Sequence, residues 1–352
     1  MNKHRFPLIF ITLVLALALA VTSVAAAPRT GASVSLSTSQ KSFSASQPVM
    51  VTVTLTNPTG STLRLLKWFT PVSGLEEALF SVKRDGQAVG YTGAIYKRPP
   101  ATSADYISLK AGESLTFKVN LGDYYDLSRS GLYEISYAVT SYNLYSEKGN
   151  GFKYQDTLTS VSIKVSVAGH ASKGGKPTPP PDGYGNYYDR CTTTQQSEAL
   201  TARTEATNYS SNALSYLNTG KSDARFTTWF GVFDPTRYST VTTHFTKITE
   251  AFVTAGITYH CACKQPYYAY VYPNQPYNIY LCKYFWLAPM SGTDSKGGTL
   301  IHEMSHFYVV ASTDDYVYGQ SGAKSLAISD PSKAIMNADN HEYFAENTPP
   351  LP

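Results

Sequence analysis

The sequence predicts a chain of two folded domains, an all-β sandwich of Ig-like type followed by an α+β domain. The chain has 352 residues, which is about the length of two ordinary domains. Its first half alternates apolar and polar residues in short runs, and its second half adds segments of helical periodicity. A stretch rich in Gly, Lys and Pro separates the halves. We therefore place the sandwich at 28–168, the linker at 169–186 and the α+β domain at 187–352.

Residues 1–27 have the parts of a secretory signal peptide. Lys3 and Arg5 supply positive charge, an apolar run covers 9–21, and small residues precede Pro28. An N-terminal membrane anchor is the alternative, but the short run and the small residues after it favour a signal. No later segment is apolar and long enough to span a bilayer. We therefore expect a secreted, extracellular protein with no membrane partner after signal cleavage.

The predicted sandwich depends on strands with a period of two. Apolar residues alternate with polar ones at 49–55, 115–119, 133–137 and 161–167. Asp85-Gly86 is typical of a hairpin turn. Several short strands at regular spacing, without helical periodicity, are typical of an antiparallel sandwich. This half contains no cysteine, so it lacks the usual inter-sheet disulfide.

The second half mixes helices and strands. Thr193 with Gln196 resembles a capping box at the start of a helix. A helix that follows Gly297-Gly298 carries the most informative residues of the chain, discussed below. We expect the other helices at 198–217, 236–253, 319–328 and 341–346, and strands at 257–261, 268–272 and 278–282.

Composition excludes some classes of partner. The formal net charge is +4, and only 15% of residues are charged. No basic stripe with interleaved aromatic residues is present, so nucleic acid is not an expected partner. We expect a monomer.

The four cysteines all lie in the second half, and behind an export signal they predict two disulfides. Cys261 and Cys263 point to one face of a strand and are poor partners for each other, which leaves two pairings. We favour Cys191–Cys261 with Cys263–Cys282. A structural Cys₄ zinc site is the competing interpretation, but the paired C-x₂-C spacing is missing.

Thr299 to Phe307 contains the pentad His-Glu-x-x-His. His302 and His306 are four residues apart, so on a helix both imidazoles project from one face and can bind one Zn²⁺. Glu303 can then take a proton from a water molecule at the metal. The pentad also arises by chance, so its context decides.

A catalytic zinc needs a third protein ligand. Metzincins place a Gly and then a His after the pentad, but Val309 and Ser312 occupy those positions, which excludes that class. Gluzincins use a downstream Glu, for which Glu342 and Glu346 are candidates. The remaining candidates are the neighbouring carboxylates Asp314 and Asp315.

The segment after the pentad resembles the aspzincins, the deuterolysin-like zinc endopeptidases. Their signature places G-T-x-D-x-x-Y-G soon after HExxH, and Thr313, Asp315, Tyr318 and Gly319 match it. Ser312 stands where the family has Gly, a mild departure if the backbone there does not need positive φ. The resemblance implies a zincin-like fold with one Zn²⁺, Asp315 as third ligand and Tyr318 as oxyanion donor.

The resemblance extends to the peptidyl-Lys metalloendopeptidase branch. It covers most of 186–350, including the segments 225–231, 269–273 and 333–344 and the cysteine spacing. It implies that Asp339 and Glu342 bind a lysine on the primed side of the cut. Two carboxylates in a narrow pocket favour a compact ammonium over a planar guanidinium. The alternative is that Asp339 caps a short helix and Glu342 is solvated.

The sequence thus predicts a secreted zinc endopeptidase that cuts on the amino side of lysine in polypeptide substrates. An aspzincin of broader specificity is one alternative, and a non-catalytic secreted binding or adhesion protein with structural zinc is another. We expect the 28–168 half to be a propeptide that inhibits the enzyme or helps it fold. Lys173 and Lys176 in the linker are candidate sites of self-cleavage.

Overall fold

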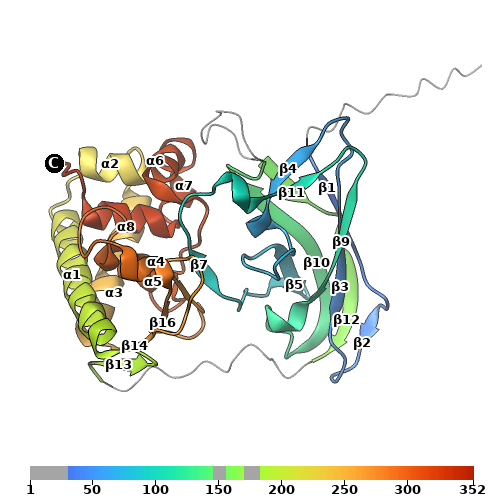
Figure 1. Ribbon diagram of the computed structural model, residues 1–352, viewed down its shortest axis with the longest axis horizontal. Coiled ribbons are helices and arrows are strands. Elements are labelled where there is room, and N and C mark those ends of the chain that lie inside the picture. The colour runs from blue at the N-terminus through green and yellow to red at the C-terminus, as the bar shows by residue number, and fades with distance from the viewer. Residues whose placement is uncertain (1–30, 146–155, 170–182) are drawn as a thin grey trace, which may run out of the picture.

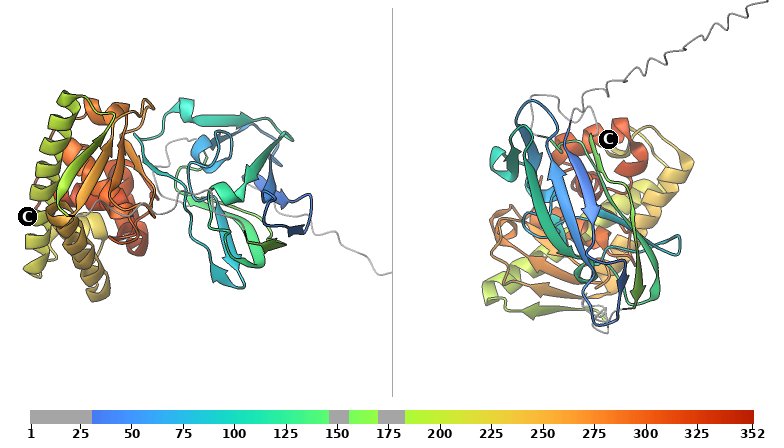
Figure 2. Two further views of the ribbon diagram at one scale, coloured as in Figure 1. Left: turned by 90° about the horizontal axis from the view of Figure 1, so that it is seen from below. Right: turned by 90° about the vertical axis from the view of Figure 1, so that its right-hand side faces the viewer.

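A computed structural model describes residues 31–145, 156–169 and 183–352 (Figure 1). The predicted signal peptide and the two candidate self-cleavage lysines, Lys173 and Lys176, lie outside the described residues. The described chain forms a strand-built half and a helix-rich half, which lie side by side in both Figure 1 and the left view of Figure 2.

The N-terminal half is mostly strands, in one three-stranded sheet (β1-β3-β9), one six-stranded sheet (β2-β12-β10-β5-β6, with β11 on β10) and the pair β4-β8. The three-stranded sheet contains β1 (Ser33–Ser37), β3 (Met50–Thr56) and β9 (Ser114–Asn120). The six-stranded sheet contains β2 (Ser42–Phe43), β5 (Phe80–Arg84), β6 (Gln87–Ala88), β10 (Ser130–Ser141), β11 (Asp156–Thr159) and β12 (Ile163–Ala168). The pair consists of β4 (Leu63–Leu66) and β8 (Tyr106–Leu109).

The alternation in the sequence corresponds to burial in these strands. In β3, Val51, Val53 and Leu55 face the core while the threonines between them do not, because successive side chains point to opposite faces. Asp85 and Gly86 join β5 to β6 with positive φ at both residues, as a tight hairpin requires. The predicted strands in this half are therefore present, and the Ig-like type stays a prediction.

The C-terminal half combines helices with one mixed sheet. Its helices are α1 (Thr193–Asn218), α2 (Ala224–Phe230), α3 (Pro235–Thr254), α4 (Lys283–Leu287), α5 (Lys296–His306), α6 (Gly319–Ser329), α7 (Pro331–Ala334) and α8 (Ala338–Glu346). Its strands are β13 (Gly185–Asp189), β14 (Gly256–His260), β15 (Ala269–Val271) and β16 (Asn278–Leu281). The predicted helices and strands of this half are all present, with shifted ends. The short helices α2, α4 and α7 were not predicted.

One strand crosses the predicted domain boundary. The sheet of the C-terminal half has the order β13-β14-β16-β15-β7, and β7 (Ile95–Lys97) comes from the N-terminal half. It pairs antiparallel with β15, placing Tyr96 beside Tyr270 and Lys97 beside Ala269. Figure 1 shows β7 at the junction between the halves. The backbone of β15 forms a sheet edge, and β7 covers this edge. No sequence pattern within residues 95–97 predicts the pairing.

Two helix starts differ from the prediction. Helix α1 is capped by Thr192 with Gln195, one residue before the predicted pair. Helix α5 begins at Lys296, so Gly297 and Gly298 lie inside it, and Ser295 caps it by accepting from the Gly298 N–H at 2.9 Å.

The glycine inside α5 has a packing reason. A Cβ on Gly298 would lie 2.0 Å from the Glu346 carboxylate of α8. That carboxylate accepts hydrogen bonds from the backbone N–H and the hydroxyl of Ser295, both at 2.8 Å. The glycine thus lets α5 and α8 approach closely.

Two disulfides, Cys191–Cys261 and Cys263–Cys282, brace the sheet, and this is the pairing favoured from the sequence. Among the described residues no cysteine is free, so a Cys₄ zinc site is excluded. Within the described ranges, no helix has the length and apolarity needed to cross a membrane.

Candidate active site

Helix α5 brings the pentad into the interior. His302, Glu303 and His306 are fully buried, and the two imidazole centroids lie 4.8 Å apart. The spacing of four residues places both rings on one helical face, as expected from the sequence.

The chain after α5 folds back so that Asp315 faces both histidines. Its Oδ1 lies 3.2 Å from His302 Nε2, and its Oδ2 lies 3.6 Å from His306 Nε2. The turn is held by the Thr313 N–H, which donates to the Ser305 carbonyl at 3.1 Å. The structure thus brings together three of the predicted ligands, while Glu346 is engaged at the start of α5.

These three residues fit a zinc ion. Their ligand atoms all lie within 4.8 Å of one another, and both Nε2 atoms lack a well-aligned hydrogen-bond partner. His306 Nδ1 lies 2.9 Å from the Thr313 carbonyl oxygen, to which it donates. This bond leaves the Nε2 lone pair for a metal. Two imidazoles and one carboxylate are a donor set typical of catalytic zinc.

Buried charges tune the ligands. Burial alone would raise the pKa of Asp315, but His302 and His306 outweigh it and hold that pKa well below its usual value. Burial also raises the pKa of Glu303, and after partial compensation by the two histidines it is about 7. Both oxygens of Glu303 lack a hydrogen-bond partner among the described residues, so the carboxylate is available for chemistry.

Tyr318 lies beside this group. Its hydroxyl is 3.1 Å from Asp315 Oδ2 and 2.8 Å from the carbonyl oxygen of Tyr96 in β7. Burial, with Asp315 as the next cause, raises the pKa of Tyr318 well above its usual value. The phenol therefore keeps its proton and can donate it in a hydrogen bond.

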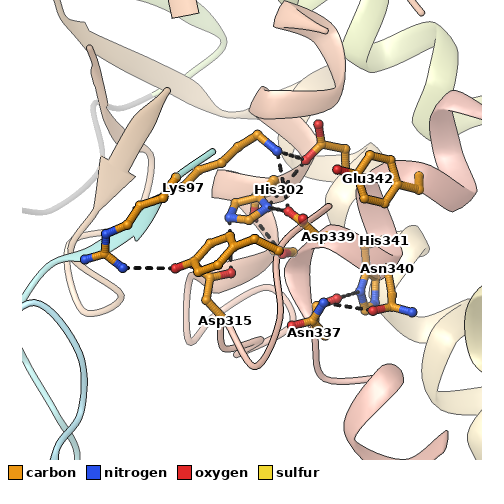
Figure 3. Close-up of polar contacts among 12 residues, drawn as sticks. Lys97, His302, Asp315, Asn337, Asp339, Asn340, His341 and Glu342 are labelled. Carbon is orange, nitrogen blue, oxygen red and sulfur yellow. Dashed lines mark hydrogen bonds and ion pairs between the residues drawn. The ribbon is translucent and has the colours of Figure 1, made fainter. Parts of the chain in front are cut away.

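A second acidic cluster lies on the other side of His302 (Figure 3). His302 Nδ1 is 2.8 Å from Asp339 Oδ1 and 3.4 Å from Glu342 Oε2. Both carboxylates come from the first turns of α8 and are buried. The solvated interpretation of Glu342 is therefore wrong, because this side chain is fully enclosed.

The side chain of Lys97 fills this cluster. Its ammonium pairs with Glu342, lies 3.4 Å from Asp339 Oδ1 and lies 3.9 Å from Asp294 Oδ1. The ring of Tyr268, centred 5.2 Å away, adds a cation–π contact. Although burial lowers the pKa of Lys97, Asp339 and Glu342 outweigh it, so the residue is a buried ammonium ion. We call this enclosure, formed by Asp294, Asp339, Glu342 and Tyr268, the ammonium pocket.

Two asparagines brace the site from behind. The Asn337 Oδ1 accepts from the Tyr316 N–H at 2.8 Å, and its Nδ2 donates to the Asn340 Oδ1 at 2.8 Å. Asn340 in turn donates to the Ala323 carbonyl at 3.0 Å. These bonds tie the loop of Asp315 to α8 and fix the two carboxylate clusters relative to each other.

Several of these residues were missed from the sequence. Asp294, Asn337 and Asn340 have ordinary spacing, so no local pattern could single them out. Lys97 lies in the other half, and only the pairing of β7 with β15 brings it here.

Known proteins resemble this chain over most of its length. The aspzincin family, described as "Lysine-specific metallo-endopeptidase", matches residues 215–346. An "Extracellular protease" of Aeromonas hydrophila is 45% identical over 84% of this chain and 87% of its own length. A "Peptidyl-Lys metalloendopeptidase" of Armillaria mellea is 36% identical over 84% and 86%. A solved "zinc peptidase from Grifola frondosa" is 46% identical, with TM-score 0.43, over 46% of this chain and 99% of its own.

Proposed function

The chain belongs to the aspzincin family of zinc metalloendopeptidases, and from that premise we propose that it is a secreted proenzyme that cuts on the amino side of lysine. Family membership confirms the predicted enzyme class and its zinc, and it excludes a non-catalytic binding protein. The name of the Armillaria relative supports lysine specificity. The predicted signal peptide and the name of the Aeromonas relative support secretion.

The observation that carries the proposal is the position of Tyr96 and Lys97. An ammonium fills the acidic pocket, and the carbonyl just before that lysine faces Tyr318 at 2.8 Å. A substrate with lysine after the cut bond would place the same two groups in the same two places. The antiparallel pairing with β15 is also the way an extended peptide adds to a sheet edge.

In the proposed reaction His302, His306 and Asp315 would hold a zinc ion, which would supply Lewis acidity and lower the pKa of a nearby water. Glu303 would take a proton from the attacking water and pass it to the leaving amine, and both of its carboxylate oxygens lack a hydrogen-bond partner among the described residues. Tyr318 donates to the oxygen of the cut carbonyl, an interaction of a kind worth about 3 kcal/mol in the transition state.

The same contacts support a proenzyme. While β7 lies on β15, a substrate cannot reach this edge or the ammonium pocket. Arg98 anchors the strand, because its buried guanidinium pairs with Glu77 and lies 4.9 Å from the ring of Trp68. The N-terminal half contains no cysteine, so it cannot inhibit the enzyme by placing a thiolate on the zinc.

Peptide cleavage tests the specificity. The matured enzyme should cut a peptide only before lysine, and a chelator should abolish the cut. The Glu303→Gln variant should be inactive on the same peptide. Equal cleavage before arginine or apolar residues would keep the protease and reject the lysine pocket.

A second experiment tests inhibition and maturation. In a full chain with Lys173 and Lys176 both changed to Ala, Lys97→Ala should raise activity on a small lysine peptide, because loss of the Lys97 ion pairs weakens the binding of β7 to the sheet edge. A comparison of the N-terminal sequences of the secreted wild type and the secreted Glu303→Ala variant then tests whether the enzyme cuts its own linker. Maturation of the inactive variant at the same bond would assign the cut to another protease.

A further inference from the structure

A row of side chains crosses the five-stranded sheet of the C-terminal half. Neighbours in register are Asp189 on β13, His260 on β14, Tyr280 on β16, Tyr270 on β15 and Tyr96 on β7. The His260 and Tyr280 rings stack at 4.2 Å, and the Tyr280 and Tyr270 rings stack at 4.5 Å. Tyr96 is the only member of this row that the N-terminal half contributes.

The row ends at Tyr96, the residue before Lys97, which fills the ammonium pocket. The Tyr96 ring lies 5.2 Å from Tyr270 and 5.1 Å from Tyr267. Because successive side chains of a strand point to opposite faces, Lys97 enters the interior while Tyr96 stays on this aromatic face. Any extended peptide that put a lysine into the ammonium pocket would therefore place its preceding side chain between Tyr267 and Tyr270.

Tyr270 lies on β15 of the C-terminal half, whereas Tyr267 contacts both halves, because its hydroxyl donates to Glu76 Oε1 at 3.3 Å. Disulfide Cys263–Cys282 ties the loop that carries Tyr267 to the end of β16. At the far end of the row, His260 Nδ1 lies 2.9 Å from Asp189 Oδ2. Tyr267, Tyr270 and Tyr272 line one side of a cavity of about 890 Å³ whose other side is formed by the N-terminal half, so the space beside these rings opens further when that half leaves.

We propose that Tyr267 and Tyr270 form a subsite for an aromatic side chain, so that the preferred cut lies between an aromatic residue and lysine. This inference rests on the proposed function and deepens it. Lysine would be required by charge, whereas the aromatic residue would add affinity through ring packing. The class of preferred substrate is thus an aromatic–lysine sequence in an extended segment.

The test compares two peptides on one enzyme matured from the full chain. Ala-Ala-Tyr-Lys-Ala-Ala and Ala-Ala-Ala-Lys-Ala-Ala differ only at the residue before lysine. We expect kcat/KM to be about ten-fold higher for the tyrosine peptide. In Tyr267→Ala this ratio should fall toward one, and in Tyr267→Phe it should persist because the ring remains.

The ratio does not depend on the amount of folded enzyme, so a destabilised variant still gives a result. Tyr187→Ala, a substitution at an exposed tyrosine of β13, is the matched control and should keep the ten-fold ratio. A wild-type ratio near one, or a ratio unchanged in Tyr267→Ala, would overturn the subsite while leaving lysine specificity intact. Failure to cut either peptide before lysine would instead reject the proposed function.

Discussion

The two sides of the His302 imidazole have similar neighbours and different occupants. On the Nε2 side lie His306 and Asp315, and on the Nδ1 side lie Asp339 and Glu342. Each side gathers three groups that could hold a cation, all of them buried. Yet the second side receives an ammonium from Lys97, while the first fits zinc.

The difference lies in where the imidazole proton sits. Asp339 faces Nδ1 at 2.8 Å, so the proton belongs on that nitrogen and the lone pair belongs on Nε2. A protonated nitrogen cannot bind a metal, so the Asp339 side is left to accept donors such as an ammonium. One histidine thereby separates a metal site from a lysine site, and Asp339 serves both.

A substitution among the proposed zinc ligands, on the Nε2 side of His302, should have the largest effect on activity. Asp315→Ala removes a proposed zinc ligand, so we expect loss of zinc and a fall in activity beyond the roughly 100-fold that loss of an outer partner can cost. Metal content by mass spectrometry and peptide cleavage measure the two effects. Asp314→Asn is the matched control, because Asp314 is the adjacent carboxylate and lies outside the ligand group. If Asp314→Asn lost zinc instead, the ligand assignment would be wrong.

Two substitutions on the lysine side should separate its roles. Asp339→Asn should weaken zinc affinity about 10- to 100-fold and also reduce cleavage before lysine, because Asp339 faces both His302 and the ammonium. Glu342→Gln should reduce kcat/KM for lysine peptides about ten-fold or more without lowering the zinc content. Zinc titration and cleavage kinetics on both variants test this difference. Equal zinc loss in both variants would contradict separate roles for Asp339 and Glu342.

A smaller effect, on the pH dependence of stability, should come from the histidine pair His244 and His341. His244 Nδ1 lies 3.0 Å from His341 Nε2, and burial lowers the pKa of His341 to about 3 and that of His244 to about 4. Both are therefore neutral when folded and take up protons on unfolding below about pH 6.5. The stability they contribute is present above that pH and is lost as pH falls toward 4, by at most about 1.4 kcal/mol per pH unit for each. Urea unfolding at pH 7.5 and pH 5 measures this, and His244→Gln should flatten the dependence.

The smallest effect concerns the turn before Asp315. Ser312 has φ of 53°, so the backbone does adopt the left-handed conformation that a glycine would suit. Ser312→Gly should raise the free energy of unfolding by up to about 1 kcal/mol, because the Cβ strain disappears. Thermal melts of Ser312→Gly and Ser312→Ala form the comparison, and Ala, which keeps the Cβ, should give no gain. The condition under which the departure from the family pattern would be mild is therefore not met, because the backbone at Ser312 does have positive φ.

Much of the metal side could be predicted from sequence because its members are close along the chain. The helical period of the pentad predicts two ligands, whereas proximity left both Asp314 and Asp315 open as the third, and the family resemblance selected Asp315. Asp339 and Glu342 came from family resemblance, since carboxylates three residues apart are common on helices. The predicted cap of α1 was off by one residue: Thr192 and Thr193 are both residue types that cap helices, and Thr192 forms the capping box with Gln195.

Contacts between the halves could not be predicted. Residues 95–97 are too few to identify as a strand, and nothing in them points to β15. In the sequence, Lys97 looks like an ordinary surface lysine. Only the fold encloses it between the edge of the sheet and α8. The domain boundary placed at the linker stays a prediction, and it does not anticipate that β7 joins the sheet of the C-terminal half.

The strand that fills the site is part of the same chain, and this has a consequence for timing. If the chain is the proenzyme proposed above, then while the linker is intact β7 would compete with substrates at a high effective concentration, which dilution cannot lower. Once the linker is cut, the hold of β7 becomes an ordinary bimolecular equilibrium. Release would then be favoured in a dilute extracellular medium and disfavoured inside a crowded export compartment, so dispersal itself could act as the final step of activation.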